Sequence, residues 1–241
     1  ALADASGGIL PDVTAAVGVV FAHDWRGHHV IRLLDVRTGE TRLLTERGNA
    51  SDPRVTPDGQ HVLFVLDRID DAPDLWRVAV AGGEPERVGM LNADKLEGLV
   101  MSGSESHVVP GAGGRDVQLY EVKPPDFDPK RKYPLLLWIH GGPVHSYLDQ
   151  FHFRWNAQIY AAQGYVVIMV NPRGSTGFGQ DFIEGNNGNW GDLCYVDLMA
   201  VTDAWARRPY VDASRMAALG ASFGGYMVNW LAGREKRFRC L

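Results

Sequence analysis

The sequence has little of what marks several large classes of protein. It contains only two cysteines, Cys194 and Cys240, which excludes a disulfide framework and leaves the redox compartment open. It has no run of roughly 18 to 20 uncharged apolar residues, so we expect no membrane-spanning helix and no membrane partner. The first ten residues, ALADASGGIL, lack a basic stretch and a long apolar stretch. They do not resemble a targeting segment, and the compartment, periplasmic or cytoplasmic, stays open.

Positive charge and metal-ligand patterns are also scarce. The 24 basic and 29 acidic residues give a net charge of −5 at pH 7. That balance, without a basic run, argues against nucleic acid as a partner. The pair His28-His29 is placed in a loop, and His145 and His152 lack neighbouring cysteines or carboxylates at metal-binding spacing. We therefore expect neither a metal nor another cofactor.

What is present begins with a repeat. The 241 residues, 45% of them apolar, suffice for one large or two smaller packed domains. Residues 17–24 (VGVVFAHD) align with 61–68 (HVLFVLDR), and the same shift places 31–44 on 75–88. Strand pairs repeated every roughly 40 to 50 residues indicate β-propeller blades, with a β-meander as the alternative. Since propellers use roughly four to eight blades, we predict that residues 1–112 form part of one.

The pattern after Gly113-Gly114 is typical of an α/β domain. Continuous apolar strands that alternate with helices indicate a parallel sheet covered on both faces. The expected strands are 117–122, 135–140, 165–170 and 216–220, and the expected helices are about 150–163, 193–207 and Phe223 to about Leu231.

The stretch GASFGG places Ser222 between glycines, directly after an apolar strand and before a helix. In this context G-x-S-x-G predicts a nucleophile elbow, a tight turn that exposes a serine hydroxyl at the end of a sheet. Gly220 and Gly224 would let the strand and the helix approach closely. We predict Ser222 as a nucleophile, with the backbone N–H of Phe223 facing a developing oxyanion. A structural turn serine is the alternative.

The sequence His140-Gly141-Gly142-Pro143 ends the strand LLLWIH, where α/β sheets form ligand crevices. Paired glycines allow backbone N–H groups to point at a substrate carbonyl. We therefore predict Gly142 as the second oxyanion donor, with Gly141 as the alternative. His140 is interpreted as a loop-ordering residue, because α/β-hydrolases take their catalytic histidine from a loop after the nucleophile.

A third loop, NPRGSTGFG (171–179), would flank the same cleft, where Arg173 either orders the loop or touches a substrate. The residues Asn189-Trp190-Gly191-Asp192 predict a loop that ends in an N-cap for the next helix. Inside that helix, Asp197 and Asp203 are interpreted as carboxylates on a solvated face.

In their order and spacing, HGGP, NPRGSTGFG, NWGDLCYVDLMA and GASFGGYM resemble the prolyl oligopeptidase family of serine peptidases. The HGGP and GASFGGYM forms are most similar to its acylaminoacyl-peptidase and dipeptidyl-peptidase V branch. The resemblance implies that residues 113–241 are the N-terminal part of an α/β-hydrolase catalytic domain, preceded by a propeller that restricts access to short peptides. It also implies a peptidase acting from the N-terminus of short peptides, with Ser222 as nucleophile and Phe223 and the HGGP loop as oxyanion hole.

The sequence departs from this family in one respect. Alpha/beta-hydrolases order their triad Ser, Asp, His, yet VNWLAGREKRFRCL, which follows GGYM, contains neither Asp nor His. Without a base, a serine hydroxyl is a weak nucleophile. We therefore expect the triad Asp and His outside this chain, which looks like an internal fragment, with the remaining segment of the same protein or a second copy as partner. An esterase and a catalytically silent propeller and hydrolase-fold binding module are the alternatives.

Overall fold

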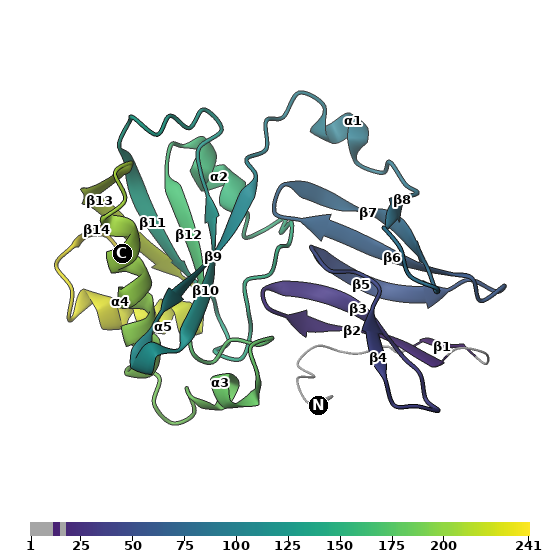
Figure 1. Cartoon of the computed structure of the whole chain (residues 1–241). Coiled ribbons are helices and arrows are strands. Elements are labelled where there is room, and N and C mark those ends of the chain that lie inside the picture. Colours follow the sequence, from purple (N-terminus) through teal and green to yellow (C-terminus); the bar gives the residue numbers. More distant parts are fainter. Residues whose placement is uncertain (1–11, 15–17) are drawn as a thin grey trace. The chain divides into compact units, whose positions relative to one another are not determined.

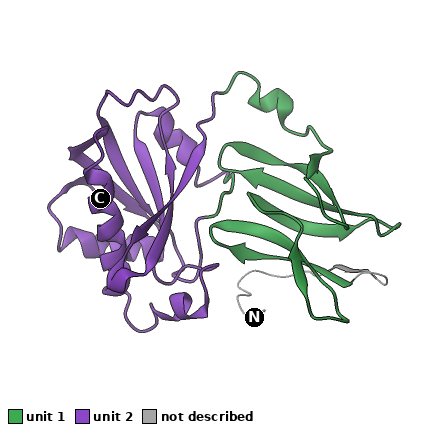
Figure 2. Ribbon diagram, in the orientation of Figure 1, with its two compact units in different colours: residues 1–99, 148–152 green, residues 100–147, 153–241 purple. Residues whose placement is uncertain are grey.

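The computed structural model describes residues 12–14 and 18–241 (Figure 1). The stretch ALADASGGIL considered above lies outside the described residues. Contacts between residues divide the chain into two compact units, which Figure 2 shows in separate colours. Unit 1 comprises residues 1–99 and 148–152, and unit 2 comprises residues 100–147 and 153–241.

Unit 1 is built mainly from β-strands. They are β1 (Asp12–Thr14), β2 (Gly18–Trp25), β3 (His28–Leu34), β4 (Thr41–Leu43), β5 (Asn49–Val55), β6 (His61–Arg68), β7 (Asp71–Ala79) and β8 (Glu86–Arg87), followed by the short helix α1 (Ala93–Leu96). The sheet has the order β1-β2-β3-β5-β6-β7-β8, with β4 paired to β3. Neighbouring strands are antiparallel except β3 and β5, which share one parallel bridge between His29 and Asn49.

The repeat seen in the sequence corresponds to repeated strands. The aligned segments 17–24 and 61–68 fall on β2 and β6. The second pair of aligned segments runs from β3 into β4 and from β7 into β8. Val20 and Phe64, which the alignment superposes, are both buried in the core of unit 1.

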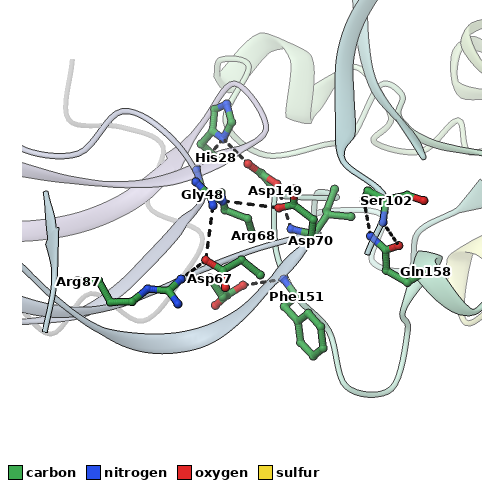
Figure 3. Close-up of polar contacts among 12 residues, drawn as sticks. His28, Gly48, Asp67, Arg68, Asp70, Arg87, Ser102, Asp149, Phe151 and Gln158 are labelled. Atoms are coloured by element: carbon green, nitrogen blue, oxygen red, sulfur yellow. Dashed lines mark hydrogen bonds and ion pairs between the residues drawn. The ribbon is translucent and has the colours of Figure 1, made fainter. Parts of the chain in front are cut away.

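The segment 148–152 is separated in sequence from the rest of unit 1, and backbone hydrogen bonds hold it there (Figure 3). The N–H of Asp149 donates to the carbonyl oxygen of Gly27 at 2.7 Å. The Oδ1 atom of Asp149 accepts the N–H of Ile69 at 3.1 Å. The segment is therefore bonded to two turns of the unit 1 sheet.

A second buried carboxylate completes this attachment. Asp67 accepts the N–H of Phe151 on Oδ1 at 2.7 Å and the side-chain amide of Asn49 on Oδ2 at 2.9 Å. Only 4% of the Asp67 surface is exposed. Burial raises the pKa of Asp67 to about 6, against the lowering effect of these hydrogen bonds.

Unit 2 contains a six-stranded sheet and most of the helices. Its strands are β9 (Ser104–Pro110), β10 (Asp116–Val122), β11 (Tyr133–Ile139), β12 (Val166–Asn171), β13 (Val211–Gly220) and β14 (Phe238–Cys240). Its helices are the 3₁₀ turn η1 (Ala112–Gly114), α2 (Ala157–Ala162), α3 (Gln180–Glu184), α4 (Leu193–Ala206) and α5 (Phe223–Ala232). The order is β14-β13-β11-β12-β10-β9, in which the pairs β12-β10 and β10-β9 are antiparallel and the other pairs are parallel. None of the described helices is long and apolar enough to cross a membrane.

The central strand β11 packs against helices on both of its faces. Leu135, Leu137 and Ile139 belong to the same core cluster as residues of α4 and α5. Trp138, which points to the opposite face, meets Tyr160 of α2 edge to face at 5.2 Å between ring centroids. A strand buried on both sides explains why LLLWI is apolar throughout rather than alternating.

Four expectations about elements and boundaries differ from the structure. His28 and His29, expected in a loop, begin strand β3, where they pair with β2. The helix expected over about 150–163 is confined to α2, because residues 148–152 bond to unit 1 and the Asn156 side chain caps the helix by accepting the Gln158 N–H at 2.9 Å. The strand expected at 216–220 begins at Val211. The boundary expected after residue 112 differs from the division between Leu99 and Val100, because β9 pairs with β10.

Candidate active site

The carboxyl end of β13 turns into α5 at Ser222. This residue has φ 56° and ψ −123°, a region that residues with a Cβ atom adopt rarely and at an energetic cost. Its side chain is exposed. The first turn of the helix closes behind it, because the Tyr226 N–H donates to the Ser222 carbonyl oxygen at 3.0 Å. The strand-turn-helix geometry expected from GASFGG is therefore present, and the chemical role of Ser222 stays a prediction.

The glycines around Ser222 allow three backbone segments to meet. A methyl group added at Gly224 would lie 2.2 Å from the carbonyl oxygen of Ile139 and 2.9 Å from that of His140. A methyl group at Gly220 would lie 2.5 Å from the carbonyl carbon of Gly224. Neither position can take a side chain unless main-chain atoms move. Helix α5 therefore lies directly against the end of β11, where the HGGP loop begins.

This packing brings the HGGP loop beside Ser222. A methyl group added at Gly141 would lie 3.4 Å from Ser222 Cβ and 3.9 Å from its Oγ. Gly142 has φ 120°, which favours glycine, and the peptide bond between Gly142 and Pro143 is cis. Phe223 is the first residue of α5, so its N–H has no acceptor within the helix. The structure thus places Gly141 beside the serine side chain, whereas the assignment of Gly142 and Phe223 as oxyanion donors stays a prediction.

His140 lies buried between the HGGP loop and the loop 171–179. Its Nδ1 atom is 2.6 Å from the carbonyl oxygen of Gly141, and its Nε2 atom is 2.9 Å from Ser175 Oγ. Burial lowers the pKa of His140 to about 4, so the ring is neutral at pH 7. These contacts fit the interpretation of His140 as a loop-ordering residue.

Further hydrogen bonds join the same two loops. The side chain of Asn171 accepts the Tyr147 N–H at 2.7 Å and donates to the Tyr147 carbonyl oxygen at 2.8 Å. The Ser146 hydroxyl donates to the carbonyl oxygen of Thr176 at 2.6 Å. The loop after HGGP is therefore bonded to the loop after β12 at several points.

Asp197 was expected on a solvated face, and this expectation is wrong. The Asp197 carboxylate is fully buried and forms an ion pair with Arg173, with Nε to Oδ2 at 3.2 Å. It also accepts the backbone N–H groups of Arg173 at 2.9 Å and Ala112 at 2.7 Å. The structural role of Arg173 is to hold the loop 171–179 against α4 and η1. The spacing from Cys194 through Asp197 to Val201, which follows one buried helix face, is the signal that could have shown this.

A cleft of about 590 Å³ opens beside α5. It is lined by Gly188, Asn189, Trp190, Gly191, Asp192, Tyr195, Val196, Tyr226, Trp230 and Arg234. The Trp190 ring meets the rings of Phe223 and Tyr226 at 5.3 and 5.6 Å between centroids. Asp192 occupies the N-cap position of α4, as expected, but its side chain makes no capping hydrogen bond and instead accepts from Asn189 Nδ2 at 3.1 Å.

Sequence reasoning missed one group of potential metal ligands. Glu105, His107 and Glu121, on the paired strands β9 and β10, place one ligand atom each within 4.8 Å of the others. Lys123 Nζ lies 2.7 Å from a Glu105 oxygen and 3.6 Å from a Glu121 oxygen. Trp205 Nε1 donates to Glu121 at 2.9 Å. Lys123 and Trp205 therefore already bind the carboxylates of Glu105 and Glu121. Glu121 is remote in sequence from Glu105 and His107, and only the register of β9 on β10 could have shown that the three lie together.

The fold and the turn together describe an α/β protein with a serine at the ends of its parallel strands, an arrangement typical of serine hydrolases. Residues 151–241 match the model of the prolyl oligopeptidase family. Over these residues the chain is similar to that family.

Named relatives agree with that similarity. Dipeptidyl-peptidase 5 of Porphyromonas gingivalis is 35% identical over 208 residues, which cover 85% of this chain and 30% of that protein. Probable dipeptidyl-peptidase 5 of Aspergillus terreus is 43% identical over 204 residues, which cover 82% of this chain and 28% of that protein. The chain therefore spans less than a third of the length of either relative.

Among solved structures, acylaminoacyl peptidase of Pyrococcus horikoshii superposes with a TM-score of 0.84 at 20% identity. The superposition covers 96% of this chain and 36% of that one. At this identity the likeness shows the fold.

Proposed function

We propose that the protein is a serine peptidase that removes short units from the N-termini of peptides, with Ser222 as its nucleophile. Unit 1 supplies part of a β-propeller in this proposal, and unit 2 supplies the N-terminal part of the α/β-hydrolase domain. The observation that carries the proposal is the backbone of Ser222, which has φ 56° in a strand-helix turn where Gly220 and Gly224 have no room for side chains. The relatives named dipeptidyl-peptidase 5 support the choice of reaction.

The reaction follows from the proposed roles. Ser222 Oγ attacks the scissile carbonyl carbon, and the carbonyl oxygen becomes an oxyanion that accepts hydrogen bonds from the N–H groups of Phe223 and Gly142. The amine leaves with a proton and an acyl-enzyme ester remains. A water molecule then attacks the ester and releases the N-terminal product. Phe223 is the first residue of α5, so an oxyanion bound to its N–H would also be stabilised by the positive end of the helix dipole.

The base that activates Ser222 comes from the rest of the longer protein in this proposal. His140, the histidine of the neighbouring loop, is engaged with Gly141 and Ser175 and is neutral at pH 7. The relatives are about three times as long as the part that this chain matches, which leaves room for the triad Asp and His.

The unit removed is most simply a dipeptide. The dipeptidyl-peptidase 5 relatives are 35% and 43% identical, whereas the acylaminoacyl peptidase is similar at 20% and supports the fold alone. Removal of a single acylated residue is the second candidate within the same chemistry.

The test uses the natural full-length protein and a fluorophosphonate probe. We expect the intact mass to rise by one probe, fragmentation to locate the probe on Ser222, and the Ser222→Ala variant to stay unlabelled. A Ser214→Ala variant, at an exposed position near the amino end of β13, controls for the general loss of a hydroxyl and should still be labelled. An unlabelled wild-type protein would contradict the proposal. Rates on peptides with a free N-terminus, on acetylated peptides and on simple esters then distinguish the dipeptidyl, acylaminoacyl and esterase reactions.

A further inference from the structure

Strands β9 and β10 bring two glutamates and a histidine to one face of the unit 2 sheet. In the register of this antiparallel pair, Glu105 lies directly opposite Glu121. His107 is two residues from Glu105 on β9, so its side chain leaves the same face of the sheet. Like charges directly opposite each other destabilise such a pair, and Glu121 is almost fully buried. The two carboxylates therefore require positive charge or donors around them.

Three potential ligand atoms converge between these side chains. The Nε2 atom of His107 lies 3.1 Å from Oε2 of Glu121 and 3.5 Å from Oε2 of Glu105. Nε2 carries at most one proton, which can point at only one of the two oxygens. A metal ion would bind all three atoms. Around a tetrahedral zinc ion with ligands at about 2.0 to 2.2 Å, neighbouring ligand atoms are about 3.3 to 3.6 Å apart, close to the separations found here.

The other oxygen of each carboxylate is held by hydrogen bonds. Oε1 of Glu121 accepts Trp205 Nε1 and the Tyr210 hydroxyl, both at 2.9 Å. Oε1 of Glu105 accepts Lys123 Nζ at 2.7 Å. Lys123 Nζ is 3.6 Å from Oε2 of Glu121, which is beyond hydrogen-bond distance. These donors fix the direction of both carboxylates through Oε1, as outer-shell partners do in metal sites, and leave the two Oε2 atoms for a further partner.

The charge states of these groups suit a cation. The hydrogen bond from Lys123 lowers the pKa of Glu105, so this side chain is a carboxylate at neutral pH. Burial raises the pKa of the Tyr210 hydroxyl, and the neighbouring Glu121 carboxylate raises it further. Tyr210 therefore stays protonated and continues to donate.

The histidine is oriented and the group is open to solvent on one side. The ring of Trp205 meets the imidazole of His107 edge to face at 5.1 Å between centroids. The side chain of His107 is 26% exposed and that of Glu105 is 55% exposed. An ion can therefore enter from solvent, and water can supply a fourth ligand.

We propose that Glu105, His107 and Glu121 bind a zinc ion at the β9–β10 edge of unit 2. One imidazole nitrogen with two carboxylate oxygens suits Zn²⁺ better than Mg²⁺ or Ca²⁺, which are bound by oxygen ligands. The ion joins the edge strand β9 to β10, and the hydrogen bond from Trp205 to Glu121 connects it to α4. The site contains no residue of the candidate active site, so the inference goes beyond the proposed peptidase activity.

Two substitutions and a control separate metal binding from hydrogen bonding. In His107→Gln, the amide nitrogen can take the place of Nε2 and donate to Glu121, but an amide is a poor zinc ligand. Glu105→Gln removes a charged ligand at an exposed position. Since loss of an outer-shell partner alone costs about 10- to 100-fold in metal affinity, we expect both variants to weaken Zn²⁺ binding at least about 100-fold. Asp116→Asn, which removes an exposed carboxylate at the start of β10, is the matched control and should bind as the wild type does.

The measurements are calorimetric titration of the metal-free full-length protein with ZnCl₂, melting temperatures with and without Zn²⁺, and anomalous diffraction at the zinc edge. We expect a Zn²⁺-binding event that His107→Gln and Glu105→Gln lose and Asp116→Asn keeps. Zn²⁺ should raise the melting temperature of the wild type and the control by more than that of the two ligand variants.

The anomalous peak of the wild type should lie between the three ligand atoms, which tests the site even if a variant does not fold. Equal Zn²⁺ affinities of the wild type, His107→Gln and Glu105→Gln would overturn the inference. A peak in crystals without binding in solution would mean an adventitious ion only and would also overturn it. Fluorophosphonate labelling of Ser222 in the same metal-free samples tests the proposed function separately.

Discussion

The sharpest stability test compares two neighbouring glycines in α5. In Gly224→Ala, the new methyl group would lie 2.2 Å from the Ile139 oxygen and 2.9 Å from the His140 oxygen, both main-chain atoms at the end of β11. The first distance is roughly 1 Å below the optimal separation of such atoms. In Gly225→Ala, the nearest atom is the Gly220 oxygen at 3.5 Å, which is ordinary contact.

The two variants share one effect and differ in another. Replacing a helical glycine by alanine stabilises a helix by roughly 0.5 to 1 kcal/mol, and this gain is common to both positions. Overpacking typically costs about 1 to 3 kcal/mol, and only Gly224→Ala incurs it. The difference between the variants therefore isolates the overpacking, with Gly225→Ala neutral or slightly more stable than the wild type. The shift in melting temperature per kcal/mol falls with protein size and is roughly 2 to 4 °C for 150–250 residues, so in the longer full-length protein we expect Gly224→Ala to melt lower by up to a few degrees.

The assay is thermal and urea unfolding of the natural full-length protein, followed by the rate of fluorophosphonate labelling at 25 °C. Gly224→Ala must move the end of β11 away from α5, so we also expect its labelling of Ser222 to slow by at least about tenfold, since a displacement of about 1 Å near a reacting group can cost 10²-fold. Gly225→Ala should label at the wild-type rate. Equal melting temperatures and equal labelling rates for the two variants would refute the close-approach argument.

Other predictions concern buried charges and protons. Asp197→Asn leaves the Arg173 guanidinium buried without its charged partner, so urea unfolding should show a loss of about 3 to 5 kcal/mol, and a loss below 1 kcal/mol would contradict the ion pair. The folded-state pKa of Asp67 is raised from 3.8 to about 6, so its contribution to stability is present below pH 3.8 and lost as pH rises through 6. Urea unfolding should show that Asp67→Asn removes a pH-dependent loss of about 2 kcal/mol between pH 4 and 7, and an unchanged slope would contradict that pKa. The folded-state pKa of His140 is lowered to about 4, so its contribution is present above pH 6.5 and is lost as pH falls. Between pH 6.5 and 5 the free energy of unfolding, measured with urea, should fall by about 2 kcal/mol because of His140, and this part of the loss should be absent in His140→Asn. Equal losses in the wild type and the variant would refute the lowered pKa of His140.

Local sequence patterns predicted the elements around the site because the signals there are strong. An uncharged run such as LLLWI has few structures available other than a strand buried on both faces. Gly220 and Gly224 predicted a close approach between β13 and α5. The structure confirms it, because a side chain at either position would overlap main-chain atoms. Helix α4 was located within a residue at each end.

Other features depend on partners that are remote in sequence. Asp197 is polar by type, and only Arg173 and the N–H of Ala112 make its burial favourable. The helix expected from about residue 150 does not form before α2, because Asp149 and Phe151 are hydrogen-bonded to the sheet of unit 1. The strands β9 and β14 are short or polar, so pairing rather than hydrophobic periodicity defines them.

The place of residues 148–152 means that neither unit is a continuous piece of the polypeptide. Expression of residues 1–99 alone would remove the Asp149 carboxylate from the Ile69 N–H and the Phe151 N–H from the Asp67 carboxylate. A fragment of residues 100–241 would contain Asp149 and Phe151 but lack Ile69 and Asp67, to which they are hydrogen-bonded here. A cut between domains along the sequence, the usual route to an isolated catalytic fragment, would thus damage both products. A usable fragment would have to replace residues 148–152 with a designed loop.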